Sequence, residues 1–135
     1  MDQIYPDQGL IDVLNAIVGP DLQYHLFVND VTPDLDTVLT DLTEAAWSGY
    51  VPITVPAGAF SFTSLAEHVG QVTADQIPFP NTSGTDQTVY GYYATYPGGG
   101  NLILCARFDG APIVIPYLTT RLVTPGVANY SSLFS

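Results

Sequence analysis

The stretch Thr88–Asp109, TVYGYYATYPGGGNLILCARFD, decides the fold. Residues 88–96 and 102–109 are rich in aromatic and aliphatic side chains, and the connection 97–101 has the sequence Pro-Gly-Gly-Gly-Asn. Two runs of strand-forming residues around a short glycine-rich connection are typical of an antiparallel hairpin. We therefore predict two paired strands joined by a hairpin loop over 97–101.

The chain continues as β-structure after this hairpin. Gly110-Ala111-Pro112 is a turn signal, and the apolar runs 113–118 and 119–125 predict further strands in an antiparallel meander. The tail 126–135 is apolar and aromatic, so we expect it to dock on its own domain or on a neighbouring protein.

Two helices are predicted before the hairpin. Residues 9–19, GLIDVLNAIVG, place their apolar side chains at helical spacing. Thr32-Pro33 is a helix start, because a hydroxyl cap precedes proline at the first helical position. We therefore expect a short helix or turn segment over 34–47, in which Asp41 and Glu44 have the spacing of a capping box.

Strands are expected on either side of the second helix. The run 22–29 is aromatic and aliphatic, and 50–65 predicts two strands that meet at Pro56. Pro52 and Pro56 cannot donate to a β-ladder, so they place this part at a sheet edge or a bulge. Residues 66–86 are the least regular part, in which Pro78, Pro80 and the run 81–86 predict a loop.

These elements predict a single β-rich structural domain over residues 1–135. The expected fold is mainly β, a small antiparallel sandwich or barrel with one N-terminal helix and a short second helix. A chain of 135 residues with 47% hydrophobic residues can bury a core of its own.

The charge of the chain limits its partners. The chain contains thirteen acidic residues, two arginines and no lysine, which gives a net charge of −11. A nucleic-acid partner is excluded, because phosphates need lysine or arginine to neutralise them, and an anionic membrane is disfavoured for the same reason. The charge keeps the protein soluble, and it also suits a neutral or cationic protein partner. No run reaches the ~18 apolar residues of a membrane span, and the N-terminus lacks the basic region of a secretory signal.

No catalytic or metal-binding motif is present. His25 and His68 are the two histidines, and neither belongs to a metal-ligand pattern. The acids between Asp30 and Asp41 resemble a calcium loop only superficially, since the glycine and glutamate of that motif are missing, and a weak calcium site is left open. We expect no enzyme, no catalytic residue, no metal and no cofactor. A buried carboxylate beside either histidine in a pocket would reopen the enzyme hypothesis.

Two further residues have expected structural roles. Cys105 is the lone cysteine and lies in an apolar run, so it is interpreted as a small buried hydrophobe. Arg107 is expected to form an ion pair with Asp109 or with another acid.

Aromatic residues suggest an interface. Nine tyrosines and six phenylalanines are present, and several tyrosines crowd the strand 88–96. They form either a β-core with hydroxyls at its rim or a protein contact surface, in which tyrosine is enriched. The residues predicted to form the interface are Tyr92, Tyr93, Tyr96, Tyr130, Leu133 and Phe134.

Three stretches resemble small virion proteins of tailed bacteriophages and prophages. They are YHLFVNDVTPDLDTVLTDLTEAAWSGYVPITV (24–55), TVYGYYATYPGGG (88–100) and LILCARFDGAPIVI (102–115), and they occur in the family's order. Ala106 departs from the family pattern, which has an acid before the arginine. The match is carried by Asn29, Asp30, Thr32, Pro33, Gly49, Tyr50, Tyr90, Gly91, Tyr92, Arg107, Phe108, Asp109, Gly110 and Pro112.

The resemblance implies a structural role in the virion. The first hypothesis is a capsid decoration or cement protein that binds the major capsid protein on the outer surface in many copies. A tail, baseplate or head–tail component is the second hypothesis. A glycan- or receptor-binding β-module is the third, which an exposed tyrosine or Trp47 in a groove would support. Homo-oligomerisation is compatible with all three.

Overall fold

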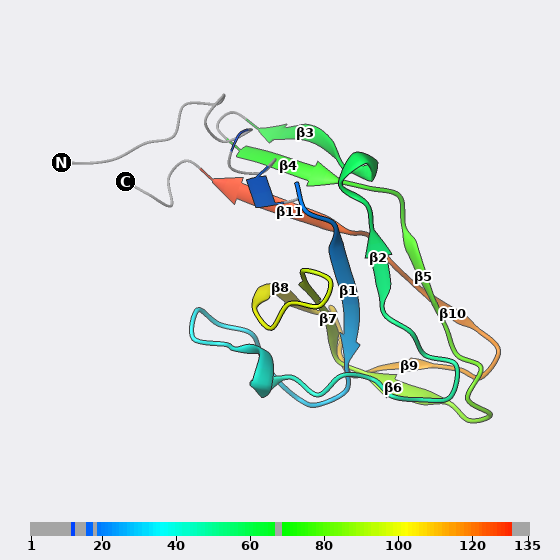
Figure 1. The fold of residues 1–135 in the computed structure, drawn as a ribbon. Coiled ribbons are helices and arrows are strands. Elements are labelled where there is room, and N and C mark those ends of the chain that lie inside the picture. Colours follow the sequence, from blue (N-terminus) through cyan, green and yellow to red (C-terminus); the bar gives the residue numbers. More distant parts are fainter. Residues whose placement is uncertain (1–11, 13–15, 18, 67–68, 131–135) are drawn as a thin grey trace.

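The structure is a computed structural model that describes residues 12, 16–17, 19–66 and 69–130 of the chain. This part is mainly β, and its strands pair antiparallel. Two 3-10 turns are present, η1 (Leu39–Asp41) and η2 (Ala57–Ala59). The strands in Figure 1 are β1 Leu22–Phe27, β2 Ile53–Val55, β3 Ser61–Ala66, β4 Val69–Thr73, β5 Ile77–Pro80, β6 Gln87–Val89, β7 Gly91–Thr95, β8 Leu102–Arg107, β9 Ile113–Ile115, β10 Thr120–Val123 and β11 Gly126–Tyr130.

The second half of the chain forms one long antiparallel ribbon. β4 pairs with β11, β5 with β10, β6 with β9, and β7 with β8. Each pair is therefore nested inside the one before it, and residues 96–101 close the ribbon at its tip. Figure 1 shows the ribbon running along β5 and β10, turning at β6 and β9, and returning to β7 and β8 beside β1.

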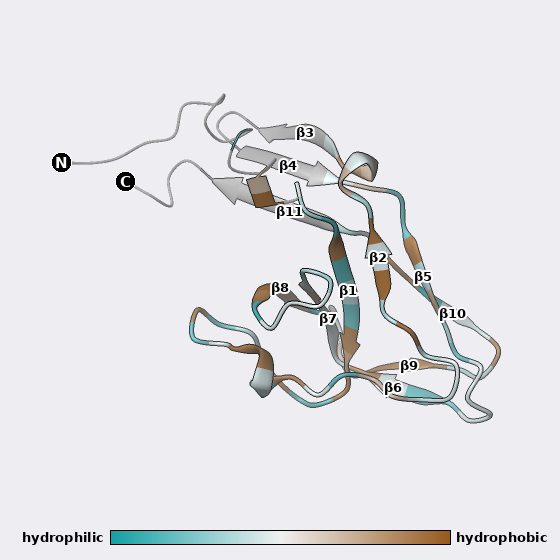
Figure 2. Cartoon of the chain, viewed as in Figure 1, coloured by the Kyte–Doolittle hydropathy of each residue, from teal (hydrophilic) through white to brown (hydrophobic). Residues whose placement is uncertain are grey.

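β1 is the strand around which this ribbon curls. It lies second in a four-stranded sheet of order β2-β1-β7-β8. Leu22, Tyr24 and Leu26 alternate along β1 and are each 0% exposed, because every second side chain points to the same face. Figure 2 shows the hydrophobic residues of β1, β2 and β5, which contribute to one interior. The larger buried cluster consists of Leu22, Tyr24, Leu26, Ala45, Trp47, Val55, Ile77, Phe79, Val89, Ala94, Ile115 and Val123, and a smaller one of Phe27, Leu42 and Tyr93.

Several predicted strands are confirmed. The run 22–29 contains β1, the two arms of the predicted hairpin pair as β7 and β8, and 50–65 contains β2 and β3 around the turn η2. β2 lies at the edge of its sheet, which is one of the two positions predicted from Pro52 and Pro56.

The predicted loop is wrong at Pro78 and Pro80, which lie in β5, whereas residues 81–86 form a loop between β5 and β6 as predicted. β4 and β5 both lie within 66–86, the part expected to be least regular. Pro78 and Pro80 are tolerated in β5 because they lie two residues apart, so both nitrogens face the edge away from β10. The Pro80 carbonyl points the same way and accepts the Trp47 indole N–H at 3.3 Å. A strand with one edge free of obligatory donors can hold two prolines.

The predicted meander over 113–125 has the wrong pairing. β9 pairs with β6 and β10 with β5, so neither extends the hairpin sheet as a new neighbour. After β8 the chain turns at Gly110, whose φ of 74° suits glycine. β9, β10 and β11 then run back along the ribbon beside β6, β5 and β4.

The N-terminal helix predicted over 9–19 is not confirmed. Most of these residues lie outside the described part of the chain. Asp12, Ala16 and Ile17 are described and have helical backbone.

The second predicted helix is replaced by irregular chain around η1. Asp41 closes this turn by accepting the Val38 N–H at 2.9 Å. The predicted capping box with Glu44 does not form, because Glu44 forms an antiparallel bridge with Phe27 of β1 instead. The long-range bridge overrides the local helical preference of this segment.

Candidate functional site

A buried polar network joins β1 and β7 to the segment after η1. His25 is 7% exposed and Thr95 is 4% exposed. His25 Nδ1 lies 2.6 Å from Glu44 Oε2, and Nε2 lies 3.0 Å from Thr95 Oγ1. Tyr50 donates its hydroxyl to the same Glu44 oxygen at 2.9 Å and accepts the Leu26 N–H at 3.0 Å. We call His25, Glu44, Tyr50 and Thr95 the histidine network.

Strand pairing explains how these residues meet. His25 is opposite Tyr93 and Gln23 is opposite Thr95 in the ladder between β1 and β7. His25 and Thr95 are therefore diagonal neighbours on one face, within reach of a long side chain. The bridge between Phe27 and Glu44 brings the carboxylate to the same face.

Two phenols lie within the field of this carboxylate. Tyr93 stacks on the His25 ring, with centroids 4.6 Å apart and planes 9° apart. Burial, and after it the charge of Glu44, raises the pKa of Tyr93 to about 12. Burial also raises the pKa of Tyr50 well above its usual range, against the lowering effect of the Leu26 N–H. Tyr50 therefore stays protonated at neutral pH and donates to Glu44.

The network has the hydrogen-bond order of a hydrolase triad: hydroxyl, imidazole, carboxylate. The condition that would reopen the enzyme hypothesis is thus partly met, although the Glu44 side chain is 37% exposed rather than buried. The network borders a hollow of about 380 Å³ that Gly98 and Gly99 also line. A nucleophile must be reachable by substrate, whereas Thr95 is 4% exposed within a strand. The arrangement fits a cross-link better, since both ring nitrogens of His25 have partners within the protein.

Replacing Glu44 with alanine is expected to lower the free energy of unfolding by about 2 kcal/mol. The change leaves the Tyr50 hydroxyl and one His25 nitrogen without their partner, and such groups cost about 1–3 kcal/mol when buried. Urea denaturation measures the effect. Asp36→Ala is the matched control, because Asp36 is exposed, and it should change stability by less than about 0.5 kcal/mol. Equal effects of the two variants would contradict the cross-link.

The described tyrosines of the predicted interface are used within the domain. Tyr93 is 4% exposed beneath the histidine network. Tyr92 is half-buried, lies 6.1 Å from the Tyr24 ring, and has its pKa raised by burial. Tyr96 donates its hydroxyl to the Ile17 carbonyl at 3.0 Å. These positions match the alternative of a β-core with hydroxyls at its margin.

The other three predicted interface residues lie near the C-terminus. Tyr130 ends β11, opposite Val69 of β4, and its side chain is outside the described part. Leu133 and Phe134 are outside the described residues altogether. Their predicted role as interface residues stays a prediction.

Arg107 forms an ion pair with Asp30 rather than with Asp109. Its Nη1 lies 2.7 Å from Asp30 Oδ1 and donates to the Val31 carbonyl at 3.1 Å. The guanidinium also lies 5.2 Å from the centroid of the Tyr90 ring. Together these contacts fasten the start of the 30–38 segment to the end of β8.

The acids after Asp30 serve as turn acceptors. Asp34 Oδ1 accepts the Asp36 N–H at 2.8 Å and the Thr37 hydroxyl at 3.2 Å. The described residues hold no group of three or more His, Cys, Asp and Glu that could bind a metal. His68 lies outside the described part.

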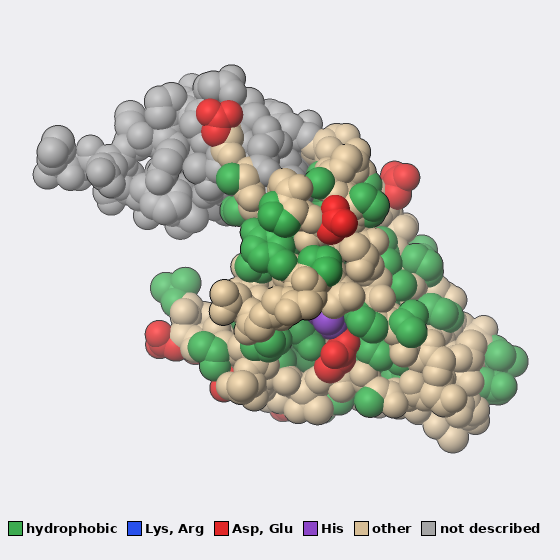
Figure 3. All heavy atoms as spheres, viewed as in Figure 1, with side chains coloured by type: hydrophobic (Ala, Val, Ile, Leu, Met, Phe, Trp, Pro, Cys, Tyr) green, Lys and Arg blue, Asp and Glu red, His purple; other side chains and the backbone are tan. Residues whose placement is uncertain are grey.

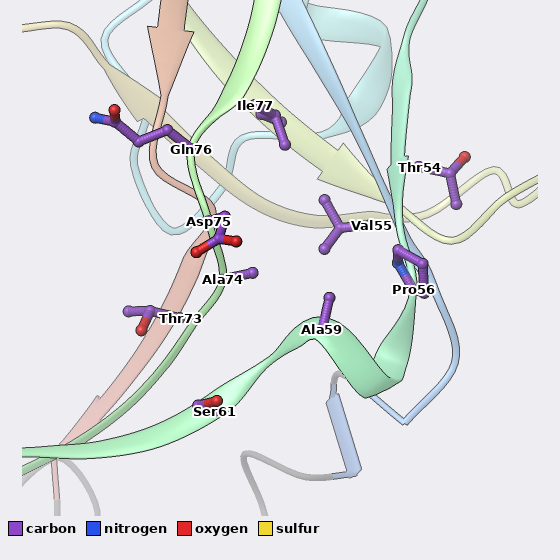
Figure 4. Close-up of a pocket in the computed structure, with 10 residues that line it drawn as sticks. All are labelled: Thr54, Val55, Pro56, Ala59, Ser61, Thr73, Ala74, Asp75, Gln76 and Ile77. Atoms are coloured by element: carbon purple, nitrogen blue, oxygen red, sulfur yellow. The ribbon is translucent and has the colours of Figure 1, made fainter.

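A hollow of about 550 Å³ lies where β2 passes the link between β4 and β5. Figure 4 shows Val55 and Ala59 pointing into it from one side and Ala74 and Asp75 lying on the other. Its lining contains no aromatic residue, so it offers no stacking surface for a sugar ring. Trp47 is only 9% exposed and packs against Tyr50, so the exposed aromatic expected of a glycan-binding groove is not found there.

The outer face of the ribbon exposes several large apolar side chains beside polar ones such as Thr88 and Thr120. In β5 and β10, Ile77, Phe79 and Val123 point inward and are buried, while the residues between them point outward. Val114, Tyr117, Leu118 and Leu122 are 54%, 43%, 72% and 51% exposed. Antiparallel sheets usually turn polar residues to water, so these exposed apolar side chains are unusual. The outer patch consists of Pro78, Pro80, Val114, Tyr117, Leu118 and Leu122.

Leu118 is held in a costly conformation within this patch. Its φ is 67°, in the left-handed region that disfavours bulky side chains. The turn is closed by the Thr119 N–H, which donates to the Pro116 carbonyl at 3.0 Å. A leucine costs about 1–2 kcal/mol more than glycine at such a position. The Leu118 side chain is 72% exposed and adds little to the core, so a contribution to folding stability does not explain why leucine occupies this position.

No known family model, curated protein or solved structure matches the chain. None of the described helical segments has the length and apolar character to cross a membrane.

Proposed function

We propose that the protein is a structural component of a tailed-phage virion, a decoration or cement protein that binds the outer capsid surface through protein–protein contacts. The outer patch carries this proposal. A protein that acts alone gains no stability from large apolar side chains in water, and clustered ones mark interaction sites. The strained, exposed Leu118 strengthens the argument, because it costs stability without adding to the core.

The resemblance of three stretches to small phage virion proteins supports the virion setting. The resembling residues include β1, β2, β7, β8 and β9, which build the central sheet and the turn of the ribbon. The net charge of −11 favours a position outside the shell, away from packaged DNA. The proposed partners are the major capsid protein or other virion proteins, with no nucleic acid, membrane, cofactor or catalytic role. We also propose that the sheets close around their common core as a small sandwich or barrel.

Purified particles should contain this protein in a fixed ratio to the major capsid protein. Quantitative mass spectrometry is expected to give a ratio near one, or copies on the order of hundreds, because many weak contacts act together in a decorating layer. A few to a few tens of copies would place the protein in the tail, the baseplate or the head–tail junction. Absence from the particle would overturn the structural role.

The outer patch can be tested without unfolding the protein. Leu122→Ser and Leu118→Gly are expected to lower occupancy on the particle about tenfold or more, since central apolar contacts carry most binding energy. Leu118→Gly should at the same time leave stability unchanged or raise it, because glycine suits a φ of 67°. Val51→Ser is the control, as Val51 is 60% exposed elsewhere on the surface. Full occupancy of both patch variants would exclude the patch as the contact surface.

A glycan- or receptor-binding module is the remaining alternative. None of the described hollows supports it with an exposed aromatic residue. A glycan screen with reproducible hits that survive Leu122→Ser would favour it over capsid binding.

A further inference from the structure

β8 is an edge strand whose free edge can be assigned from hydrogen bonds. The Leu26 N–H donates to the Tyr50 hydroxyl at 3.0 Å, and the Leu26 carbonyl accepts the Ala45 N–H at 2.9 Å. The backbone of Leu26 therefore points away from β7. In a strand, the N–H and C=O of one residue point to one edge, and those of the next residue point to the other edge. The backbone N–H and C=O of His25 therefore point toward β7, and those of its partner Tyr93 point toward β1.

The same alternation continues across the sheet. The backbone N–H and C=O of Tyr92 and Ala94 must point toward β8, where these residues lie opposite Ala106 and Leu104. Cys105, between these two partners, then directs its N–H and C=O to the outside. β8 is the last strand of its sheet, so these groups face no other described strand. Arg107 has the same orientation by alternation. The outer edge of β8 is a template for one more strand.

A groove runs along this edge. A hollow of about 630 Å³ is lined by Leu102, Ile103, Leu104 and Cys105 of β8 and by the loop 33–37. Side chains of four consecutive strand residues alternate between the two faces, so one hollow can touch all of them only along the edge. Every residue of β8 is half-buried, which leaves the apolar floor accessible.

The loop 33–37 forms a wall that is already ordered. Asp34 donates its N–H to the Thr37 hydroxyl at 2.8 Å and accepts the Asp36 N–H at 2.8 Å. The Arg107–Asp30 pair fixes the chain just before the loop. Leu35 stands at the loop with its side chain fully exposed. A rigid loop presenting a leucine loses little entropy when a partner covers that side chain.

Charge identifies the class of partner. Asp34 lines the groove and Asp36 is an exposed acid of the same loop, so the wall of the groove carries negative charge. Asp34 contributes, after burial, to raising the pKa of Cys105 on the floor of the groove. Arg107 is already paired with Asp30, and Arg121 lies 4.6 Å from the Phe108 ring. Figure 3 shows acidic side chains and no lysine or arginine on the described part of the face it presents. Two copies of a chain with charge −11 repel each other, so a second copy is a poor occupant.

We propose that the β8 edge and the loop 33–37 bind an extended segment of another protein, which adds a strand to β8 and carries apolar residues together with a lysine or arginine. Backbone hydrogen bonds to Cys105 hold the segment, Leu35 covers its apolar side chains, and the cation meets Asp34 and Asp36. The inference rests on the proposed function only in taking that protein to be another virion component.

The test uses the isolated protein and a displayed library of peptides of about eight residues, the length of a long strand. Selected peptides are expected to be apolar with lysine or arginine. N-methylation of alternate peptide nitrogens should abolish binding in one register and leave it unchanged in the other, because only one set faces β8. A bound peptide should also slow alkylation of Cys105, the only cysteine, by N-ethylmaleimide.

Leu35→Ser and Asp36→Lys should each weaken the selected peptide about tenfold, with Leu122→Ser as the unaffected control. The proposal is overturned if no peptide binds below about 1 mM, if both N-methylation registers act alike, or if Leu35→Ser has no effect. A concentration-dependent dimer that Leu35→Ser abolishes would make a second copy the occupant instead. None of these readouts involves the particle, so failure of this proposal can be distinguished from failure of the proposed virion function, which the copy-number measurement tests.

Discussion

Gly91→Ala is expected to lower the free energy of unfolding by about 3 kcal/mol, at the upper end of the usual cost of overpacking. A Cβ at Gly91 would overlap the backbone carbonyl oxygen of Ala106 and would lie 2.5 Å from ring atoms of Phe27. Phe27 is 0% exposed and β8 is hydrogen-bonded to β7, so neither neighbour can retreat without breaking other contacts. The strain falls at the start of β7, where the central sheet is joined to β6.

Thermal and urea unfolding measure this effect. A loss of 3 kcal/mol corresponds to a fall in Tm of roughly 10 °C for a domain of this size. Gly58→Ala is the matched control, because Gly58 lies in the open turn η2 with nothing within 4 Å of its Cβ position. It should be neutral or slightly stabilising. Similar stability of both variants would show that β7 and β8 are not packed as described.

Asn81→Leu is expected to destabilise the protein by a similar amount. Asn81 is 0% exposed, and its amide donates to the Thr85 carbonyl at 2.9 Å and the Ile115 carbonyl at 2.8 Å. Its side-chain oxygen accepts the Ser83 N–H at 3.0 Å. Leucine has a similar volume but leaves all three backbone groups without these partners, at a cost of about 1–3 kcal/mol for each buried one.

Asn81→Asp separates the hydrogen bonds from the shape of the side chain. The new carboxyl faces two carbonyl oxygens, so its folded-state pKa should rise above the ordinary value of about 3.9. The part of the penalty that comes from the charge is then absent below about pH 4 and grows as pH rises toward the folded-state pKa, because the unfolded chain releases the proton first. Denaturation at several pH values measures this slope, and Asn101→Asp, at an exposed loop residue, should show none. A pH-independent effect would argue against the two donated hydrogen bonds.

The sequence was most informative where structure is local. The hairpin closed by residues 97–101, the strand 22–29 and the edge position of β2 follow from short-range signals, namely glycine loops, aromatic runs and prolines. The second helix failed because Glu44 is bound by β1, which is distant in the chain. The loop prediction failed at Pro78 and Pro80 because proline signals turns locally, and only the partner strand β10 shows that one edge of β5 is free of donors.

The candidate sites show the same division. His25 was identifiable as a strand residue, but its partners Glu44 and Thr95 are 19 and 70 residues away, and no spacing rule joins them. Tyrosine content pointed to Tyr92, Tyr93 and Tyr96, whereas burial favours Leu118 and Leu122 as exposed apolar residues. Which face of a strand meets water depends on the curl of the ribbon, and the alternation in β10 alone does not reveal it.

The nested pairing of the ribbon also suggests how the chain reaches its native state. The pair β7–β8 needs only the short loop 96–101 to close, and each pair formed brings the arms of the next pair together. The chain entropy lost at each step is then that of a small loop, although β4 and β11 lie far apart in the sequence. Folding by zipping from the tip would make this topology faster than its average sequence separation implies. Amide hydrogen exchange should accordingly be slowest in β7 and become faster along the ribbon toward β4 and β11.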